Sequence, residues 1–354
     1  MTLAKLSALA GAVAMTLLSS QAVVAQNYYD GKTVTVISGY DAGGGADTIA
    51  RIFTKYWEKH LPGVSSMIVK NQTGAGGASA LNFIYEGAKA DGLTIIYQPW
   101  NPVGYLTKAP GARADYTEMP LIGGGTVAKI AYASTKTIKS PSDFLERKIK
   151  LAGSRPTANL DLISRSALDA LGVEYTYVTG FNSTAVSSVA IEQGEVDLDT
   201  ASGPGFARRV QSAMIPNGTA FSPWYYPKVL PDGTVAPIAY LEQQGIPNFY
   251  DVYVELKGEE PSGPKWEVFK FLQIVTGNML FASFAPPGTP DEAVEALRES
   301  FIATTKDPEY LEEAARFGEI SFATVEEGLG VIASMKDVEP EILEALNNLI
   351  KADQ

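Results

Sequence analysis

A regular alternation of strand-like and helix-like segments limits the fold of this chain more than any other feature. Short runs of β-branched and apolar residues predict buried strands at 33–37, 67–69, 93–97, 149–152, 175–178 and 196–198. After the first two strands, apolar residues recur at helical spacing, in 49–61 and 81–85. Strands that alternate with helices form mainly parallel sheets covered by those helices. The pattern therefore predicts an α/β fold.

The first 25 residues have the pattern of an export signal. Lys5 is followed by an uncharged apolar stretch from Leu6 to Leu18 and then by the small residues Val23-Val24-Ala25. Such a segment is typical of a secretory signal peptide and is too short for a stable membrane anchor. No twin-arginine pair precedes the apolar stretch. We therefore expect the general secretion route, with cleavage near Ala25.

The length of the chain after this segment predicts two lobes, because a single hydrophobic core rarely grows to that size. Strand signals restart after 126–134, and a second change of pattern lies near 236–253. We expect residues 26–128 and 251–354 to form the first lobe and residues 129–250 to form the second.

Several helix starts are visible in the sequence. Ser140, Thr289 and Asp307 each stand directly before a proline, which predicts a capping residue followed by proline at the first helical position. Thr324 and Glu327 have the spacing of a capping box.

Composition excludes several kinds of site. The chain has no cysteine, so disulfides, thiolate nucleophiles and lipid attachment at a mature N-terminal cysteine are ruled out. Its single histidine, His60, stands at the end of a predicted helix, which argues against histidine triads and histidine metal sites. The formal charge of −12 disfavours nucleic acid and repels anions at long range. An anion site would therefore have to be built from local dipoles and hydrogen bonds.

Two glycine-rich turns follow the first two predicted strands. The first turn runs from Tyr40 to Asp47 and contains Gly43-Gly44-Gly45, and the second is Gly74-Ala75-Gly76-Gly77. Each leads into a helix whose free N–H groups and positive dipole end suit an anion. Asp47 is expected to cap its helix and orient the first turn. Because ligands of parallel sheets bind beyond the carboxyl ends of the strands, we expect both turns at a ligand site.

Other uses of glycine-rich loops fit these turns less well. A phosphate-binding P-loop ends in Gly-Lys-Ser/Thr, and neither turn does. A dinucleotide fingerprint over 74–79 would place Ser79 at its third glycine or alanine position. The alternative to a ligand site is that the glycines only permit tight turns of the backbone.

Five motifs, in chain order, resemble those of one receptor family. They are Gly39 to Asp47 with Ala50-Arg51, Lys70 to Gly77, Ala90 to Thr94, Gly194 to Leu198, and Ala285 to Pro290. Together they are similar to the signatures of the tripartite tricarboxylate transporter receptors, the Bug-type periplasmic binding proteins. The chain resembles a divergent branch, since it has a long insertion at 254–281 and Ala201 where an aspartate is common.

This resemblance implies two α/β lobes that close on a ligand like a Venus flytrap, as in other periplasmic binding proteins. It implies that the ligand-binding residues of the first lobe are Tyr40, Ala42, Gly43, Gly44, Gly45, Asp47, Gly74, Ala75, Gly76 and Gly77. It implies that those of the second lobe are Ser154, Arg155, Thr157, Gly180, Asn182, Ser183, Thr184, Thr200 and Ser202.

Three of the candidate side chains have two interpretations each. Arg155 is either a partner for a ligand carboxylate or a solvated surface arginine. Trp100 and Tyr40 are candidates for stacking on a flat ligand, although aromatic residues near strand ends also belong to cores and rims.

We therefore predict a monomeric periplasmic receptor for a small organic anion, most simply a carboxylate. The resemblance implies that it delivers this ligand to the large and small membrane subunits of a tripartite transporter. We expect no cofactor, metal or nucleic acid, and no carboxylate pair or nucleophile–base set indicates catalysis. A ligand sensor for a signalling partner is one alternative. A cofactor-free enzyme that uses Asp47 or Asp199 is another.

Overall fold

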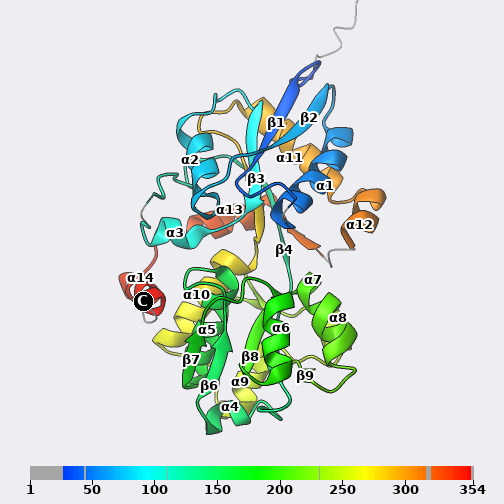
Figure 1. Ribbon diagram of the computed structural model, residues 1–354. Coiled ribbons are helices and arrows are strands. Elements are labelled where there is room, and N and C mark those ends of the chain that lie inside the picture. The colour runs from blue at the N-terminus through cyan, green and yellow to red at the C-terminus, as the bar shows by residue number, and fades with distance from the viewer. Residues whose placement is uncertain (1–26, 44, 110, 231, 316–319, 352–354) are drawn as a thin grey trace, which may run out of the picture.

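The computed structural model describes residues 27–43, 45–109, 111–230, 232–315 and 320–351. The predicted signal peptide and Gly44 lie outside the described residues. The chain forms two lobes, one above the other in Figure 1, and each is built on a six-stranded sheet with helices packed on it. The predicted two-lobed α/β fold is confirmed, but both sheets mix parallel and antiparallel pairings where we expected mainly parallel ones.

The first sheet has the strand order β14-β4-β13-β3-β1-β2. Its strands are β1 (Thr33–Ser38), β2 (Ser66–Asn71), β3 (Thr94–Pro99), β4 (Leu121–Val127), β13 (Phe281–Phe284) and β14 (Ile320–Ala323). Strand β1 pairs in parallel with β2 and β3, whereas β13 and β14 are antiparallel to their neighbours. The helices along these parts of the chain are α1 (Gly45–His60), α2 (Ala78–Glu86), α3 (Pro102–Leu106), α11 (Asp291–Thr304), α12 (Pro308–Ala315), α13 (Val325–Ser334) and α14 (Pro340–Lys351).

The second sheet has the order β10-β5-β8-β6-β7, with β9 also paired to β5. Its strands are β5 (Lys129–Ser134), β6 (Ile149–Ala152), β7 (Tyr175–Val178), β8 (Leu198–Ser202), β9 (Ala220–Phe221) and β10 (Tyr225–Tyr226). Strands β7, β6 and β8 are parallel. The helices are α4 (Asp143–Glu146), α5 (Asn159–Leu171), α6 (Thr184–Gln193), α7 (Gly203–Gly205), the π-helical η2 (Phe206–Met214), α8 (Ala239–Gln243), α9 (Phe249–Lys257) and α10 (Pro264–Gly277). A small hairpin joins β11 (Lys228–Val229) and β12 (Val235–Ala236).

Two of the predicted helix starts are confirmed and two are wrong. Thr324 and Glu327 form a complete capping box at α13. Asp307 accepts hydrogen bonds from two N–H groups in the first turn of α12. Thr289 instead donates its hydroxyl to a carbonyl of the preceding turn, and Pro290 takes the N-cap position of α11. Ser140 lies three residues before the start of α4, so it does not cap that helix.

The connections between the lobes depart from the expected boundaries at one place. The chain passes from the first sheet to the second between Val127 and Lys129. We expected it to return at 251, but α9 and the residues Trp266 and Phe269 of α10 pack in the core of the second lobe. Further along α10, Phe271 packs in the core of the first lobe. The segment 254–281 therefore contains a helix that is apolar on more than one side and joins both cores.

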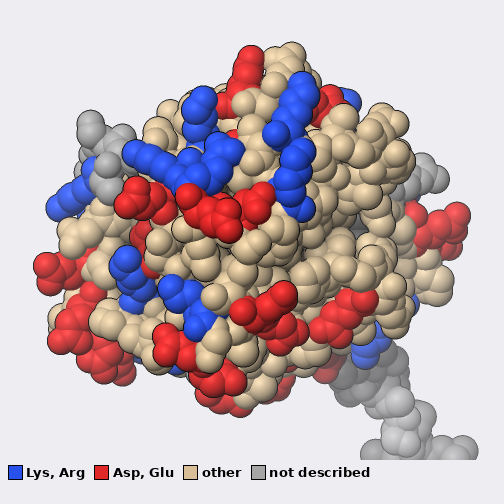
Figure 2. Space-filling model, turned by 90° about the horizontal axis from the view of Figure 1, so that it is seen from below, with Lys and Arg blue, Asp and Glu red and all other residues tan. Residues whose placement is uncertain are grey.

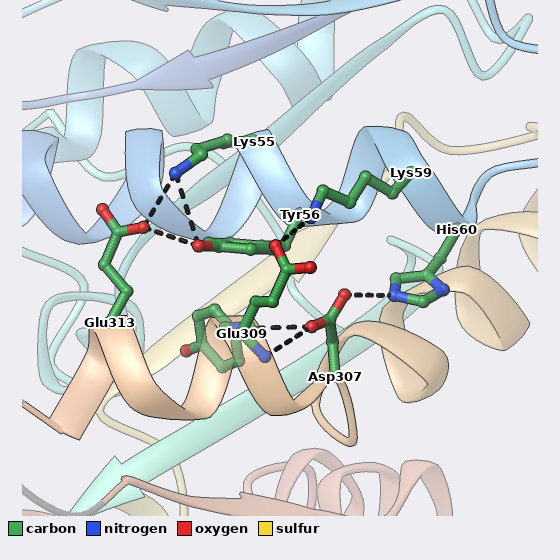
Figure 3. Close-up of polar contacts among 8 residues, drawn as sticks. Lys55, Tyr56, Lys59, His60, Asp307, Glu309 and Glu313 are labelled. Atoms are coloured by element: carbon green, nitrogen blue, oxygen red, sulfur yellow. Dashed lines mark hydrogen bonds and ion pairs between the residues drawn. The ribbon is translucent and has the colours of Figure 1, made fainter.

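Helices α1 and α12 are tied together by polar contacts along their facing sides (Figure 3). Two ion pairs at 2.8 and 2.7 Å join them, Lys55–Glu313 and Lys59–Glu309. His60 is the last residue of α1, and its Nε2 lies 2.8 Å from Asp307 Oδ2. The histidine therefore belongs to a helix contact within the first lobe.

Charged side chains of both signs lie side by side on the far end of the second lobe. Figure 2, which views the molecule from below, shows lysine and arginine next to aspartate and glutamate over this face. Neighbouring charges of opposite sign weaken each other's electrostatic field. This face therefore does not present a strong field of either sign to a charged partner.

Candidate ligand-binding cleft

A cleft of about 590 Å³ lies between the two lobes. The first lobe lines it with Tyr40, Pro99, Trp100, Asn101 and Leu280. The second lobe lines it with residues from 153–161, 181–185 and 205–209, which follow β6, β7 and β8, and with residues from 199–202 within β8 itself. Because these strands are parallel, α5 and α6 both begin at this edge of the sheet.

The structure brings about half of the predicted site residues to the cleft. Those that line it are Tyr40, Trp100, Ser154, Arg155, Thr157, Asn182, Ser183, Thr184, Thr200 and Ser202. Ala75, Gly76 and Gly77 line a smaller neighbouring cavity. Neither cavity is lined by Ala42, Gly43, Gly45, Asp47, Gly74 or Gly180.

The first glycine turn is organised around Asp47 and not around an open anion site. The Asp47 carboxylate accepts hydrogen bonds from Gly43 N at 2.8 Å, Arg51 Nε at 2.9 Å and Asn71 Nδ2 at 2.7 Å. Burial alone would raise the pKa of Asp47, but these hydrogen bonds lower it to about 2. Asp47 therefore orients the first turn as expected, but its one backbone donor among the described residues, Gly43 N, precedes α1, so these bonds do not cap the helix. The Gly43 N–H that we expected to face a ligand is used inside the turn.

The second glycine turn approaches the cleft with its backbone. Gly76 and Gly77 have φ values of 62° and 94°, which favour glycine, and Ala75 also has a positive φ of 47°. The Gly76 carbonyl accepts a hydrogen bond from the Tyr40 hydroxyl at 3.0 Å. Tyr40 thus links the two turns at the rim of the cleft.

In the second lobe, Asp161 shapes the turn after β6. Its Oδ2 accepts hydrogen bonds from Ser154 N at 2.6 Å, Arg155 N at 2.9 Å and the Tyr177 hydroxyl at 2.6 Å. Burial raises the pKa of Asp161, and these donors oppose the shift. A buried carboxylate of this kind fixes the backbone that carries Ser154 and Arg155.

The start of α6 also faces the cleft. Asn182, Ser183 and Thr184 line it, and Ser183 occupies the N-cap position without a side-chain capping bond. The first N–H groups of a helix have no partner within the helix. In α6, Val186 N already donates to the Ser183 carbonyl at 3.0 Å. The N–H groups of Thr184 and Ala185 have no partner among the described residues and are open to a ligand that carries an acceptor.

Asp199 lies at the floor of the cleft in β8. Burial raises its pKa to about 6, although the Tyr132 hydroxyl and the Thr200 N–H both donate to its carboxylate. The Thr200 hydroxyl in turn lies 2.6 Å from Ser164 Oγ. These polar groups are largely paired with one another inside the lobe.

Three arginines, Arg155, Arg208 and Arg209, bring positive charge to the cleft. All three are exposed and line it, and none forms an ion pair with any residue that the structure describes. A Cβ added at Gly76 would lie only 3.9 Å from Arg155 Nη2, so this guanidinium reaches toward the first lobe. An anion that enters the cleft would therefore meet formal positive charge from three side chains, of which the sequence had indicated only Arg155.

Sequence reasoning missed Arg208 and Arg209. They lie in η2, a π-helical segment that follows β8 and the turn Gly203-Pro204-Gly205. Single π-helical segments occur often at functional sites. The position of this arginine pair, just after a strand and a glycine turn, is the signal that could have identified it.

The Trp100 ring packs mainly in the core of the first lobe. The side chain is 2% exposed, its Nε1 donates to the Val275 carbonyl, and its ring stacks on Phe284 with centroids 5.7 Å apart. Trp100 therefore offers the cleft an edge and not a free face.

The described residues lack two other kinds of feature. Within the described ranges, no group of three His, Cys, Asp or Glu side chains could hold a metal ion. In the same part of the chain, no helix is both long and apolar enough to cross a membrane.

No protein-family model matches the sequence, and no curated protein matches it. Among solved structures, it is similar to a TctC solute-binding protein from Polaromonas, with 16% identity, a TM-score of 0.64, and coverage of 90% of this chain and 98% of the other. The periplasmic binding protein BugD has 19% identity, a TM-score of 0.58 and coverage of 90% and 97%. MatC from Rhodopseudomonas palustris, solved with bound malate, has 16% identity, a TM-score of 0.57 and coverage of 90% and 99%. At such identities the likeness concerns the fold, and the fold of this chain is that of the periplasmic binding proteins.

Proposed function

We propose that this protein is a periplasmic receptor that binds a small organic anion, a carboxylate, between its two lobes. The observation that carries the proposal is the set of three cleft arginines without carboxylate partners among the described residues. Arginine binds carboxylates in a bidentate manner. In a chain with a net charge of −12, these side chains are a local exception that favours an anionic partner.

A ligand at this place would contact both lobes. Arg155 belongs to the second lobe, yet it reaches toward the Gly76 turn of the first lobe, and Tyr40 lies at the same rim. The α6 start supplies N–H groups from the second lobe. A ligand that binds both lobes favours the closed arrangement over an open one, because only the closed state makes all of these contacts.

Delivery to a tripartite tricarboxylate-type transporter is the second part of the proposal. It is supported by the sequence motifs, by the predicted signal peptide at 1–25, and by the likeness in fold to TctC and to the malate-bound MatC. In this proposal the mature protein is a monomer in the periplasm, and its partners are the large and small membrane subunits.

The buried carboxylates of the second lobe favour binding over catalysis. The oxygens of Asp161 and Asp199 accept hydrogen bonds from side chains and N–H groups of their own lobe. A general base needs a free acceptor within reach of the substrate proton. These two side chains instead hold the cleft in shape.

A thermal-shift screen of residues 26–354 against organic acids and their uncharged amides tests the proposal. We expect acids to raise the unfolding temperature and the matched amides to have no effect. At a hundredfold excess over Kd, a ligand stabilises the folded state by about 2.7 kcal/mol. Stabilisation by sugars or cations alone would contradict the proposed ligand class. Uptake of the identified ligand by cells with and without the receptor then tests transport against sensing.

A further inference from the structure

A second cavity of about 170 Å³ opens from the cleft into the first lobe. We call it the side pocket. It lies between the turn Ala75–Gly77, helix α2 and helix α3, which lie along one flank of the first lobe in Figure 1. Pro99, Asn101 and Thr157 line both the cleft and the side pocket, so the two spaces are continuous.

The walls of the side pocket carry no charge. Among the residues that the structure describes, no lysine, arginine, aspartate or glutamate lines it. Most of this lining consists of alanine, glycine and larger apolar or aromatic residues, Leu81 and Tyr116 among them. This is the opposite of the main cleft, where three arginines gather. The change from charged to uncharged walls occurs at the shared residues.

Two polar side chains of the side pocket are already satisfied by the protein. Asn82 donates to the Gly111 carbonyl and accepts from two backbone N–H groups. Gln98 accepts from Gly39 N and donates to the Gly77 carbonyl. These amides have little capacity left to hold water, which favours an apolar occupant beside them.

One polar atom at the mouth is different. The Asn101 Oδ1 is buried and accepts no hydrogen bond from any described residue. Buried polar atoms without partners are rare in folded proteins, since each costs the loss of its hydration. Asn101 lines both the side pocket and the cleft. Because its oxygen is buried, a turn of the Asn101 amide would have to present this oxygen to a ligand at their junction.

We propose that the side pocket receives an uncharged apolar part of the ligand, a ring or a short branched alkyl group. The carboxylate of the same molecule lies at the cleft arginines, so this inference rests on the proposed function. A cavity of about 150 Å³ accommodates benzene, and the side pocket is slightly larger. A hydroxyl between the ring and the carboxylate would donate to Asn101 Oδ1. The ligand class is therefore an aryl or branched carboxylate, with a hydroxyl next to its acid group.

Titration calorimetry with acids of equal charge tests this inference. The probes are acetate, 3-methylbutanoate, phenylacetate and mandelate. We expect wild type to bind phenylacetate at least about tenfold more tightly than acetate, because a ring-sized apolar surface is buried. Mandelate, which adds a hydroxyl, should bind more tightly still, and Asn101→Ala should remove that last gain.

A substitution that fills the side pocket provides the decisive comparison. Gly104 lines the side pocket, and a Cβ added there meets only Ala109 Cβ at 3.9 Å. Gly104→Leu should therefore fold, and it should abolish the preference for phenylacetate while acetate binds as before. Ala78→Leu, also in the lining, is a second filler. Ala333→Leu, at an exposed helical alanine that lines neither cavity, is the matched control.

The possible failures are distinct. If all four acids bind wild type with one affinity, or if both fillers keep the preference for phenylacetate, the side pocket does not hold the ligand and this inference is wrong. If no organic acid binds at all, the proposed function fails and this inference fails with it.

Discussion

The substitution Asp47→Asn tests how much the buried carboxylate that organises the first glycine turn contributes to the stability of the protein. In the wild type, Oδ2 accepts hydrogen bonds from Gly43 N and Arg51 Nε, and Oδ1 accepts one from Asn71 Nδ2. Asparagine keeps the shape but has one acceptor oxygen in place of two. At least one donor would then face an amide NH₂ group, and Arg51 would lose its counter-ion.

The size of the effect follows from the pKa of Asp47. Burial opposes ionisation, yet the hydrogen bonds lower this pKa from 3.8 to about 2. At about 1.4 kcal/mol per pKa unit, such a shift corresponds to roughly 2 to 3 kcal/mol of stability. The Arg51 side chain is 47% exposed, so solvent screens its share. We therefore expect Asp47→Asn to lower the free energy of unfolding by about 2 kcal/mol at pH 7.

The pH dependence gives the sharper result. A carboxylate whose pKa is lowered by folding stabilises the protein above its unfolded-state pKa, and this stability is lost as the pH falls through the folded-state pKa. Urea unfolding at a series of pH values from 7 down to 3 should therefore show wild type losing stability faster than Asp47→Asn. The control is Asp41→Asn, an exposed carboxylate of the same turn, which should change little. A difference between wild type and Asp47→Asn that stays constant over this range, or is absent at pH 7, would refute the reasoning.

Three further outcomes are expected. Arg155→Gln should weaken binding of the carboxylate found in the screen by about tenfold or more, as the loss of a charge-assisted hydrogen bond predicts, without changing the unfolding temperature of the apo protein. Arg113→Gln, which breaks a surface pair with Glu86 outside the cleft, should leave calorimetric affinity unchanged, and equal losses for both variants would count against a specific role of Arg155. Burial raises the pKa of Asp199 to about 6, so ionisation of Asp199 should cost wild type stability as the pH rises from about 4 to 7. The stability advantage of wild type over Asp199→Asn in urea unfolding should shrink over that range, and an advantage that grows would contradict the shift. Thr324→Ala removes the capping box of α13 and should lower the free energy of unfolding by about 1 kcal/mol, an effect that Thr305→Ala, at the C-terminal end of α11, should not reproduce.

The sequence by itself determined the strands that pair in parallel, β1 to β3 and β6 to β8, and their order, but it did not indicate antiparallel strands such as β4, β5, β13 and β14. Strands β1, β2 and β3 are close to the predicted runs, and α1 carries the expected apolar spacing. The box of Thr324 and Glu327, and the cap by Asp307, were also predictable. Such features depend on residues a few positions apart, so local sequence contains the information that they need.

The tertiary structure alone decided which polar groups of the turns stay free. Asn71 reaches back to Asp47 and to the Tyr40 carbonyl, so the first turn uses its own donors, although its glycines suggested an open anion site. The cleft charge comes from Arg155 together with Arg208 and Arg209, which lie about fifty positions further along the chain. The sequence of α10 does not indicate which lobe the helix packs against. In the structure, α10 contributes side chains to the cores of both lobes. The physical reason is that a hydrogen-bonding group becomes available to a ligand only when no other segment of the fold has satisfied it, and segments distant in sequence meet only after the chain has folded.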